Sequence, residues 1–467
     1  DKKMAIFSSL AGFFNRNKRK IFITSAVTVS IYLLINEFVI KKFRNYQNAL
    51  RQQLLFKQQI KQRFIQTQQD CYYTILALLP VLAAPIIDSL PVELITQALR
   101  LKKNNSLQQV TSGSNSELTA DNLNLLDNNN NPELKLSIYM SKSKTELWNL
   151  LKIKTITRTL TLSYTVSGLF LITRLQLNIL ARRSYLESAI SNGWCQIQQI
   201  MTLIHMENYI IEQSYLSLSW WLLNKGWSNL SSIIEALVVK KFEKITPKTE
   251  LSINEFEFDL IEIINEINSN NKEYILANLF PINYSDLLET ILNTNSDLIH
   301  HLDSPESNLI KLINETNAIM LDNNLYFFDL LNALIMNTVS TLTANLSFSL
   351  GANNSLNNSL LMASSGNLAA HGENPKVVDI THNDQSFKLA SFLAQLSVQN
   401  NIMIDNDNLK TEDILPKHES DLEEILNSLN GGTNELPTES YGNVYINNLN
   451  QLEELDDFSA GIYSNFE

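Results

Sequence analysis

A long helical pattern over residues 144–186 constrains the fold more than any other feature of this chain. At about 100° per residue, one face of this helix gathers four aliphatic side chains, Leu150, Ile153, Ile156 and Leu160. A second face, roughly opposite, carries Lys144, Trp148 and Leu151. Beyond Leu160 the pattern becomes apolar nearly all round, which is typical of a helix buried in lipid or in the centre of a large bundle.

Polar side chains in the second half of this helix help to decide between the two environments. They are Arg174, Gln176, Asn178, Arg182 and Arg183. Such groups are costly at the centre of a bilayer, so the sequence favours a central core helix over a membrane span. The first turns would then present Trp148 to a partner, whereas a neighbouring helix that covered the second face would make Trp148 ordinary core.

The composition indicates an all-α protein. Glycine and proline are scarce, at 12 and 10 of 467 residues, and Leu-rich helical periods recur along the chain. Residues 1–44 carry a formal charge of +7 and the remainder carries −19. Because nucleic acids bind to basic surfaces, we expect no nucleic-acid partner for the acidic bulk of the protein.

An apolar run over residues 21–40 has the length of a membrane span. A basic N-terminal segment, residues 1–20, precedes it and a second basic cluster at residues 41–44 follows it. Twenty residues of helix reach about 30 Å, enough to cross a hydrocarbon core, and Glu37 would lie near one interface. A signal peptide would end in small residues, whereas this run ends in bulky ones. We therefore predict a single N-terminal transmembrane helix.

The remaining chain, residues 43–467, is expected to form one helical domain in which the first helix runs on from the span towards Pro80. Three Asn- and Ser-rich stretches with weak periodicity are expected to be disordered insertions, at about 104–136, 351–376 and 400–447. Besides the long helix, helices are expected over residues 91–101, 197–223, 228–242, 251–270, 284–302, 306–321, 325–347 and 386–398.

Two features near helix ends give further expectations. Gly226 follows Asn224 and Lys225 at the end of an apolar run, the position favoured for a left-handed helix cap. An apolar helical stripe over residues 449–466 comes after a long polar stretch, and we expect it to pack back onto the bundle.

No pattern in the sequence carries recognisable enzymatic chemistry. The GxGxxG, GxxxxGK[ST] and GxSxG patterns are absent, and none of the six histidines forms HExxH or a metal pair with cysteine. Cys71 and Cys195 lie far apart and make no metal-ligand spacing. We therefore expect no enzyme activity, no cofactor and no metal site.

Taken together, these segments resemble the peroxisomal biogenesis factor 3 family, in its yeast-like form. Two motifs that carry the resemblance are KTELWNLLKIKTITRT at residues 144–159 and YLSLSWWLLNKGW at 215–227. The others lie at residues 58–80, 170–180, 185–190 and 455–466, together with the basic-flanked N-terminal span. The resemblance reaches from one end of the chain to the other, but it does not include the Asn- and Ser-rich insertions.

The resemblance implies a docking receptor in the peroxisomal membrane, with passage through the endoplasmic reticulum. A single span would hold an all-helical domain in the cytosol, arranged as a large elongated bundle around a long central helix. That domain would bind an amphipathic helix of the import chaperone peroxisomal biogenesis factor 19, which delivers peroxisomal membrane proteins for insertion. Yeast members of the family also bind inheritance and pexophagy factors.

The resemblance also implies residues for the partner groove. Trp148, with Lys144 four residues before it and Leu151 three residues after it, matches the family pattern, and Leu99 matches a leucine near the end of the preceding helix. The alternative is an organelle-membrane tether that binds inheritance or cytoskeletal factors through its acidic surface. Binding through surface charge should weaken steeply with salt, whereas binding in an apolar groove should not.

Overall fold

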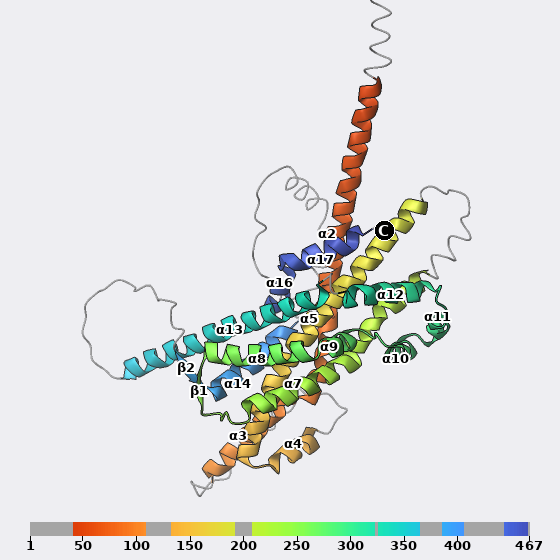
Figure 1. The fold of residues 1–467 in the computed structure, drawn as a ribbon. Helices are drawn as coiled ribbons and strands as arrows, with labels where there is room; N and C mark the ends of the chain where they lie inside the picture. The colour runs from red at the N-terminus through yellow and green to blue at the C-terminus, as the bar shows by residue number, and fades with distance from the viewer. Residues whose placement is uncertain are drawn as a thin grey trace, which may run out of the picture. The chain divides into compact units, whose positions relative to one another are not determined.

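The structure, a computed structural model, describes residues 41–108, 132–191, 208–322, 326–364, 385–405 and 443–465. Across these ranges almost all regular structure is helical, which confirms the all-α fold class (Figure 1). The chain divides into two compact units, residues 1–66 and 67–467. Of the first unit the structure describes only the beginning of helix α2 (Lys41–Ser89).

Helix α5 (Lys144–Ser191) is the central element of the second unit, as the sequence predicted (Figure 1). The helices that pack on it include α3 (Val92–Gln108), α7 (Trp227–Phe242), α13 (Phe327–Ser364), α14 (Leu389–Ile404) and α17 (Glu453–Ser464). Its middle residues, from Val166 to Leu175, are almost completely buried in the main hydrophobic core. The apolar surface on all sides is therefore covered by protein.

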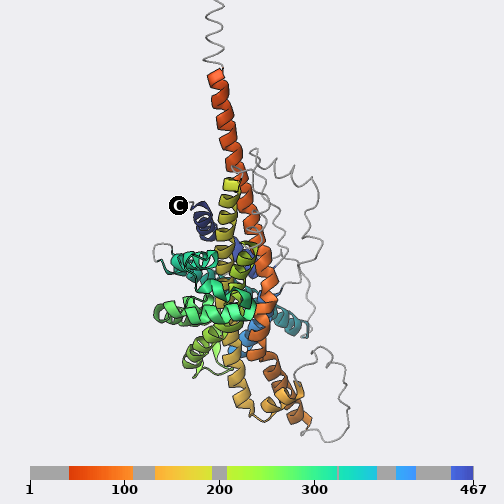
Figure 2. The ribbon, with the colours of Figure 1, turned by 90° about the vertical axis from the view of Figure 1, so that its right-hand side faces the viewer.

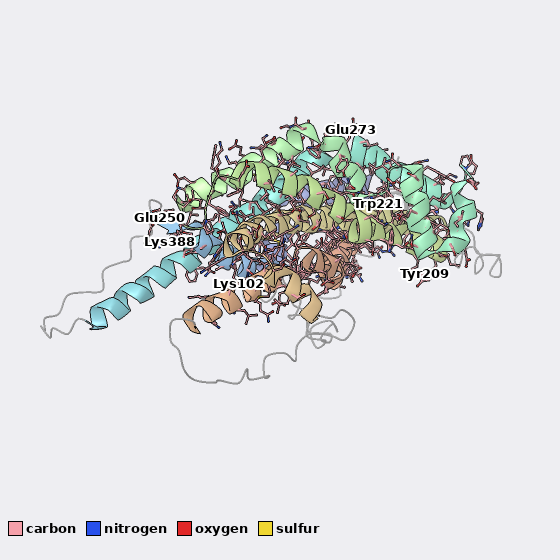
Figure 3. All side chains as sticks on the ribbon, turned by 90° about the horizontal axis from the view of Figure 1, so that it is seen from below. Lys102, Tyr209, Trp221, Glu250, Glu273 and Lys388 are labelled. Carbon is pink, nitrogen blue, oxygen red and sulfur yellow. The ribbon has the colours of Figure 1, made fainter. Side chains whose placement is uncertain are left out.

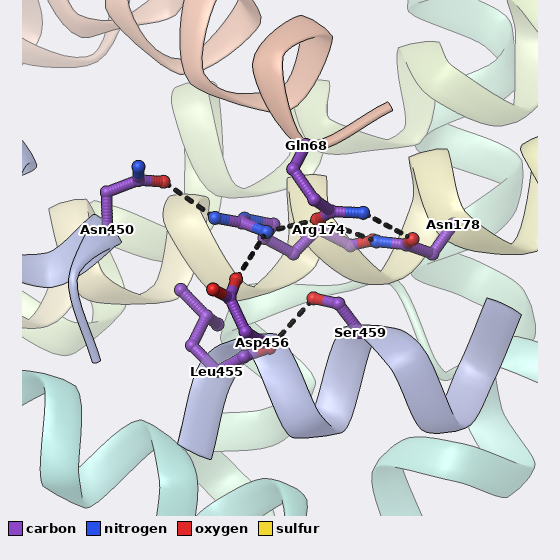
Figure 4. A network of polar contacts seen from close by, with 7 residues as sticks. All are labelled: Gln68, Arg174, Asn178, Asn450, Leu455, Asp456 and Ser459. Atoms are coloured by element: carbon purple, nitrogen blue, oxygen red, sulfur yellow. Dashed lines mark hydrogen bonds and ion pairs between the residues drawn. The ribbon is translucent and has the colours of Figure 1, made fainter. Parts of the chain in front are cut away.

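Arg174 lies in the middle of this core and is paired on several sides (Figure 4). Its guanidinium donates to Gln68 on α2, to Asn450 Oδ1 at 2.6 Å and to Asp456 Oδ1 at 3.3 Å. It also lies 5.7 Å from the ring centroid of Phe170. A polar group that would be costly in lipid is thus compensated by partners from three other elements.

Arg182, two turns further along α5, also forms hydrogen bonds with distant segments of the chain. Its guanidinium donates to the Ile462 carbonyl at 3.1 Å and to the Glu315 carboxylate. Because Ile462 belongs to α17, the last helix packs back onto the bundle, as predicted.

The remaining described elements complete the bundle around α5. They include α4 (Pro132–Met140), α8 (Ile253–Asn270), α9 (Lys272–Leu279), α10 (Tyr284–Thr294), α11 (Ile299–Leu302), α12 (Asn308–Leu321) and α16 (Val444–Asn450), with short turns η3 (Ser217–Ser219), η4 (Leu222–Gly226) and η5 (Ser296–Leu298). Residues 208–216, part of the helix predicted over 197–223, are also helical. A small antiparallel pair, β1 (Glu250–Ser252) and β2 (Ser386–Lys388), was not predicted from the sequence. Leu251 pairs with Phe387 in it, and each strand leads directly into a helix, α8 or α14.

The prediction of a left-handed cap at Gly226 was wrong. Gly226 has helical angles, φ −59° and ψ −39°, and the chain passes through the wide turn η4 directly into α7. A Cβ atom at this position would lie 1.8 Å from the carbonyl oxygen of Asn278. Glycine is required because α9 approaches the helix closely, and not because the helix ends.

Several helices extend further than the sequence predicted. Helix α2 continues through Pro80 and Pro85 to Ser89, with Leu79 and Ile86 buried in the core on either side of Pro85. The three expected insertions are shorter at their edges, because residues 104–108, 132–136, 351–364, 400–404 and 444–447 are helical. Apart from Asp405 and Asn443, the rest of these insertions lies outside the described residues.

Two described helical segments are long and apolar enough to cross a membrane, Lys57–Ser89 and Phe327–Gly351. Both also contribute side chains to the main core, for example Ile75 and Leu334, each completely buried. The predicted span over residues 21–40 lies outside the described residues and stays a prediction.

Candidate functional site

A second hydrophobic cluster, separate from the main core, lies at the N-terminal end of α5 (Figures 1 and 2). We refer to it as the small cluster. Its buried members are Val92, Ile95, Ala98 and Leu99 of α3 and Leu147 and Leu151 of α5. Partly buried side chains that pack against it are Leu136, Tyr139 and Met140 of α4 and Trp148 and Leu150 of α5.

Local sequence signals position both main helices of the small cluster. Pro91 precedes α3, and its ring favours the helical φ of a first turn. At the start of α5 the Glu146 carboxylate accepts from the Ser143 amide at 2.7 Å, and the Glu146 amide donates to Ser143 Oγ at 3.2 Å. This capping box lowers the pKa of Glu146, first through the backbone hydrogen bond and then through the Ser143 side chain.

The structure brings all four predicted site residues to this one end of the molecule. Leu99 and Leu151 are buried in the small cluster, each 7 % exposed. Trp148 is half-buried at its edge, and Lys144 is exposed in the first turn of α5. Trp148 is thus an apolar side chain one helical turn from the Lys144 cation. Leu99 and Leu151, however, are more buried than residues that line an open groove.

Helix α4 was missed by the sequence analysis, which placed most of it in an insertion. Its side chains Leu136, Tyr139 and Met140 pack against the small cluster, and burial raises the pKa of Tyr139. Ile138 faces away and is 57 % exposed. The signal that could have found α4 is the i, i+3, i+4 spacing of these three side chains after Pro132.

Two cations of α5 fasten the small cluster to the rest of the bundle. Arg158, almost fully buried, donates to both carboxylate oxygens of Glu93 on α3, at 2.8 and 2.9 Å. Lys152 donates to the carbonyls of Phe242 and Ile245 at the end of α7, at 2.6 and 2.7 Å. Burial lowers the pKa of Lys152. Helix α3 and the beginning of α5 are therefore held by charge-assisted hydrogen bonds.

Basic side chains lie on both main helices of the small cluster. Arg100 of α3 and Lys144 of α5 are exposed. Lys102 lies on α3 (Figure 3). The Lys102 ammonium donates to the carbonyl of Lys142, in the turn between α4 and α5. Among the residues that the structure describes, no group of three or more His, Cys, Asp or Glu side chains could hold a metal ion.

Comparison with known proteins assigns the chain to a family. The family model described as Peroxin-3 matches residues 12–465. The chain belongs to the peroxin-3 family. Among its peroxin-3 relatives, peroxisomal biogenesis factor 3 of Debaryomyces hansenii is 50 % identical over 99 % of this chain and 100 % of its own length.

Other peroxin-3 relatives also match over most of their length. A peroxisomal membrane protein of Komagataella phaffii is 33 % identical over 98 % of this chain and 99 % of its own length. Peroxisomal biogenesis factor 3 of Saccharomyces cerevisiae is 29 % identical over 92 % and 90 %. These proteins are named as biogenesis factors and membrane proteins, so the chain is a peroxisomal biogenesis factor of the peroxin-3 family.

Proposed function

We propose that this protein is a membrane-anchored docking receptor for the import chaperone peroxisomal biogenesis factor 19. A single span over residues 21–40 would place the helical domain in the cytosol, on peroxisomes and, in transit, on the endoplasmic reticulum. The chaperone's amphipathic N-terminal helix would bind at the small cluster. The receptor would thereby bring newly made membrane proteins to the site of their insertion.

The observation that carries this proposal is the placement of Trp148. It is half-buried at the edge of an apolar cluster that is separate from the main core, with Leu99 and Leu151 in the same cluster and Lys144 exposed one turn away. Tryptophan is among the residues most enriched at the energetic centres of interfaces, and a helix in an apolar groove is a common mode of recognition.

The test is a titration of the full chain, in detergent micelles, with a peptide of the chaperone's N-terminal helix. We expect Trp148→Ala to weaken binding at least about thirtyfold, equivalent to about 2 kcal/mol, while the melting temperature changes little. Trp220→Ala is the matched control, because Trp220 is also half-buried but lies outside the small cluster. If the Trp148→Ala protein melts at a much lower temperature, and its affinity falls only in proportion to the loss of folded protein, Trp148 belongs to the core and does not contact the partner.

The same titration at several salt concentrations addresses the alternative function, a tether that binds inheritance or cytoskeletal factors through the acidic surface. Binding in an apolar groove keeps most of its affinity as the ionic strength rises, whereas the affinity of binding through surface charge falls steeply. Steep loss together with an unchanged Trp148→Ala affinity would favour the tether.

A further inference from the structure

The small cluster is largely closed in the absence of any partner chain. Leu99 and Leu151, which the proposed function requires to contact a partner helix, are each only 7 % exposed. A partner helix that approached this conformation would meet Trp148 and Lys144, but it would reach little of the two leucines. Part of the cluster has to be uncovered before an apolar groove of useful size exists.

Helix α4 packs against the small cluster in the manner of a bound helical ligand. Leu136, Tyr139 and Met140 face the cluster at i, i+3 and i+4, the spacing with which amphipathic helices place their anchors in apolar grooves. Ile138, between them in sequence, is 57 % exposed. The helix has nine residues and packs on α3, so its departure would leave the α3–α5 contact in place.

We propose that α4 is a resident occupant of the groove, which the partner helix displaces when it binds. This inference rests on the proposed function, because it concerns access to the same site. Binding of the partner then includes the free energy of removing Leu136, Tyr139 and Met140 from the cluster, and α4 sets the apparent affinity of the receptor.

The attachments of α4 allow it to leave without unfolding its neighbours. The capping box of Ser143 and Glu146 begins α5 independently of α4, so the first turn of α5 keeps its own hydrogen bonds. Residues 109–131, which join α3 to α4, have a contour length on the order of 75 Å. The Lys102 ammonium, bound to the Lys142 carbonyl, fixes the α4–α5 turn to α3 in the closed state.

Hydrogen exchange of the full chain in detergent micelles measures the displacement directly. With the chaperone's N-terminal peptide bound, we expect the amides of residues 132–140 to exchange at least about tenfold faster, while those of α3 are protected. If α4 is instead a fixed wall of the groove, its amides will exchange more slowly in the complex. Slower or unchanged exchange in α4, with α3 protected, overturns the inference and leaves the proposed function intact.

A set of variants tests the energetic consequence. Leu136→Ala/Tyr139→Ala/Met140→Ala weakens the packing of α4 and should tighten peptide binding about tenfold if the open state is populated at about a tenth in the wild type. Ile138→Ala is the matched control on the exposed side of α4 and should bind as the wild type does. Weaker binding by the triple variant, with its melting temperature retained, contradicts the inference.

The results also separate this inference from the proposed function. Peptide binding by the triple variant but not by the wild type supports both, since α4 would then block the site almost completely. If neither the wild type nor any variant binds the peptide, the proposed function fails and the inference fails with it.

Discussion

The middle and the N-terminal end of helix α5 lie in different surroundings. Around Arg174 the helix is enclosed on all sides, and its cation has partners from α2, α16 and α17 (Figure 4). Around Trp148 the same helix has neighbours on α3 and α4, and Trp148 and Lys144 remain accessible. The enclosed middle of the helix fixes the fold, and the thinly covered N-terminal end is where we propose that a partner binds.

This difference predicts unequal stability along α5. Regions with few buried apolar contacts open locally at low free energy, whereas the main core opens only with global unfolding. Substitutions in the main core should therefore lower the stability of the whole protein, and substitutions in the small cluster should act mainly on α3, α4 and the first turns of α5.

The largest expected effect is at Gly226, in the main core. Gly226→Ala would place a Cβ atom 1.8 Å from the Asn278 carbonyl oxygen, so the backbones of η4 and α9 would have to separate. We expect a loss of at least about 3 kcal/mol in the free energy of unfolding, measured by chemical denaturation. Gly351→Ala is the control, since nothing lies within 4 Å of its Cβ position, and it should leave the stability unchanged or raise it slightly.

The next largest effect is expected at Arg174. Arg174→Met leaves Gln68 and Asn450 without their charged donor, and should cost about 3 kcal/mol. Asp456→Asn keeps the arginine and changes only a partner that is 57 % exposed, so it should cost less than about 1 kcal/mol. Equal losses in the two variants would mean that the ion pair, and not the amide partners Gln68 and Asn450, stabilises this region.

A smaller and local effect is expected in the small cluster. Leu147 is fully buried there, and Leu147→Ala should cost about 2 kcal/mol because the thinly covered site can partly collapse. Hydrogen exchange should show faster opening of α3, α4 and the first turns of α5, with the protection of residues 166–175 unchanged. Uniform loss of protection along α5 would show that its N-terminal end and its middle unfold as one unit, which would contradict the expected difference.

The smallest effect is expected from the capping box of Glu146. Its pKa is lowered in the folded protein, so its contribution is present above the ordinary value of 4.5 and is lost as the pH falls through the lowered value. We expect the first-turn amides of α5 to lose protection in that acidic range, and Glu146→Gln to remove the pH dependence. The protection of the main core should not follow the same titration.

Much of the fold could be predicted from the sequence because the apolar pattern of α5 alone identifies it as the central, buried helix. The prediction that this helix is buried in protein is confirmed by its side chains in the core and by the buried Arg174 and Arg182. The apolar stripe on α17 packs back onto the bundle, as predicted. The four predicted site residues also lie at one end of α5, although their contact with a partner stays a prediction. Periodicity predicted that these long helices exist, but not where α2 and α13 end.

The parts that were missed depend on contacts between distant segments. Helix α4 has only nine residues, and it is stabilised by packing on α3 rather than by a strong pattern of its own. The residues around Gly226 are those expected at the end of a helix. Only the close approach of Asn278, from α9, shows that the glycine is needed for packing and not for a helix cap. The strands β1 and β2 are three residues each and lie more than a hundred residues apart.

The partners of Arg174 and Arg182 have a consequence for synthesis of the protein. Asp456 lies 282 residues after Arg174, and the Ile462 carbonyl lies 280 residues after Arg182. At about 5–20 residues per second, a ribosome needs roughly 15–60 s to make that distance. Gln68 and Glu315 are made earlier, but the remaining partners of the two arginines follow only with the last helices. A nascent chain that stops short of α17 therefore lacks the residues that complete the core around α5.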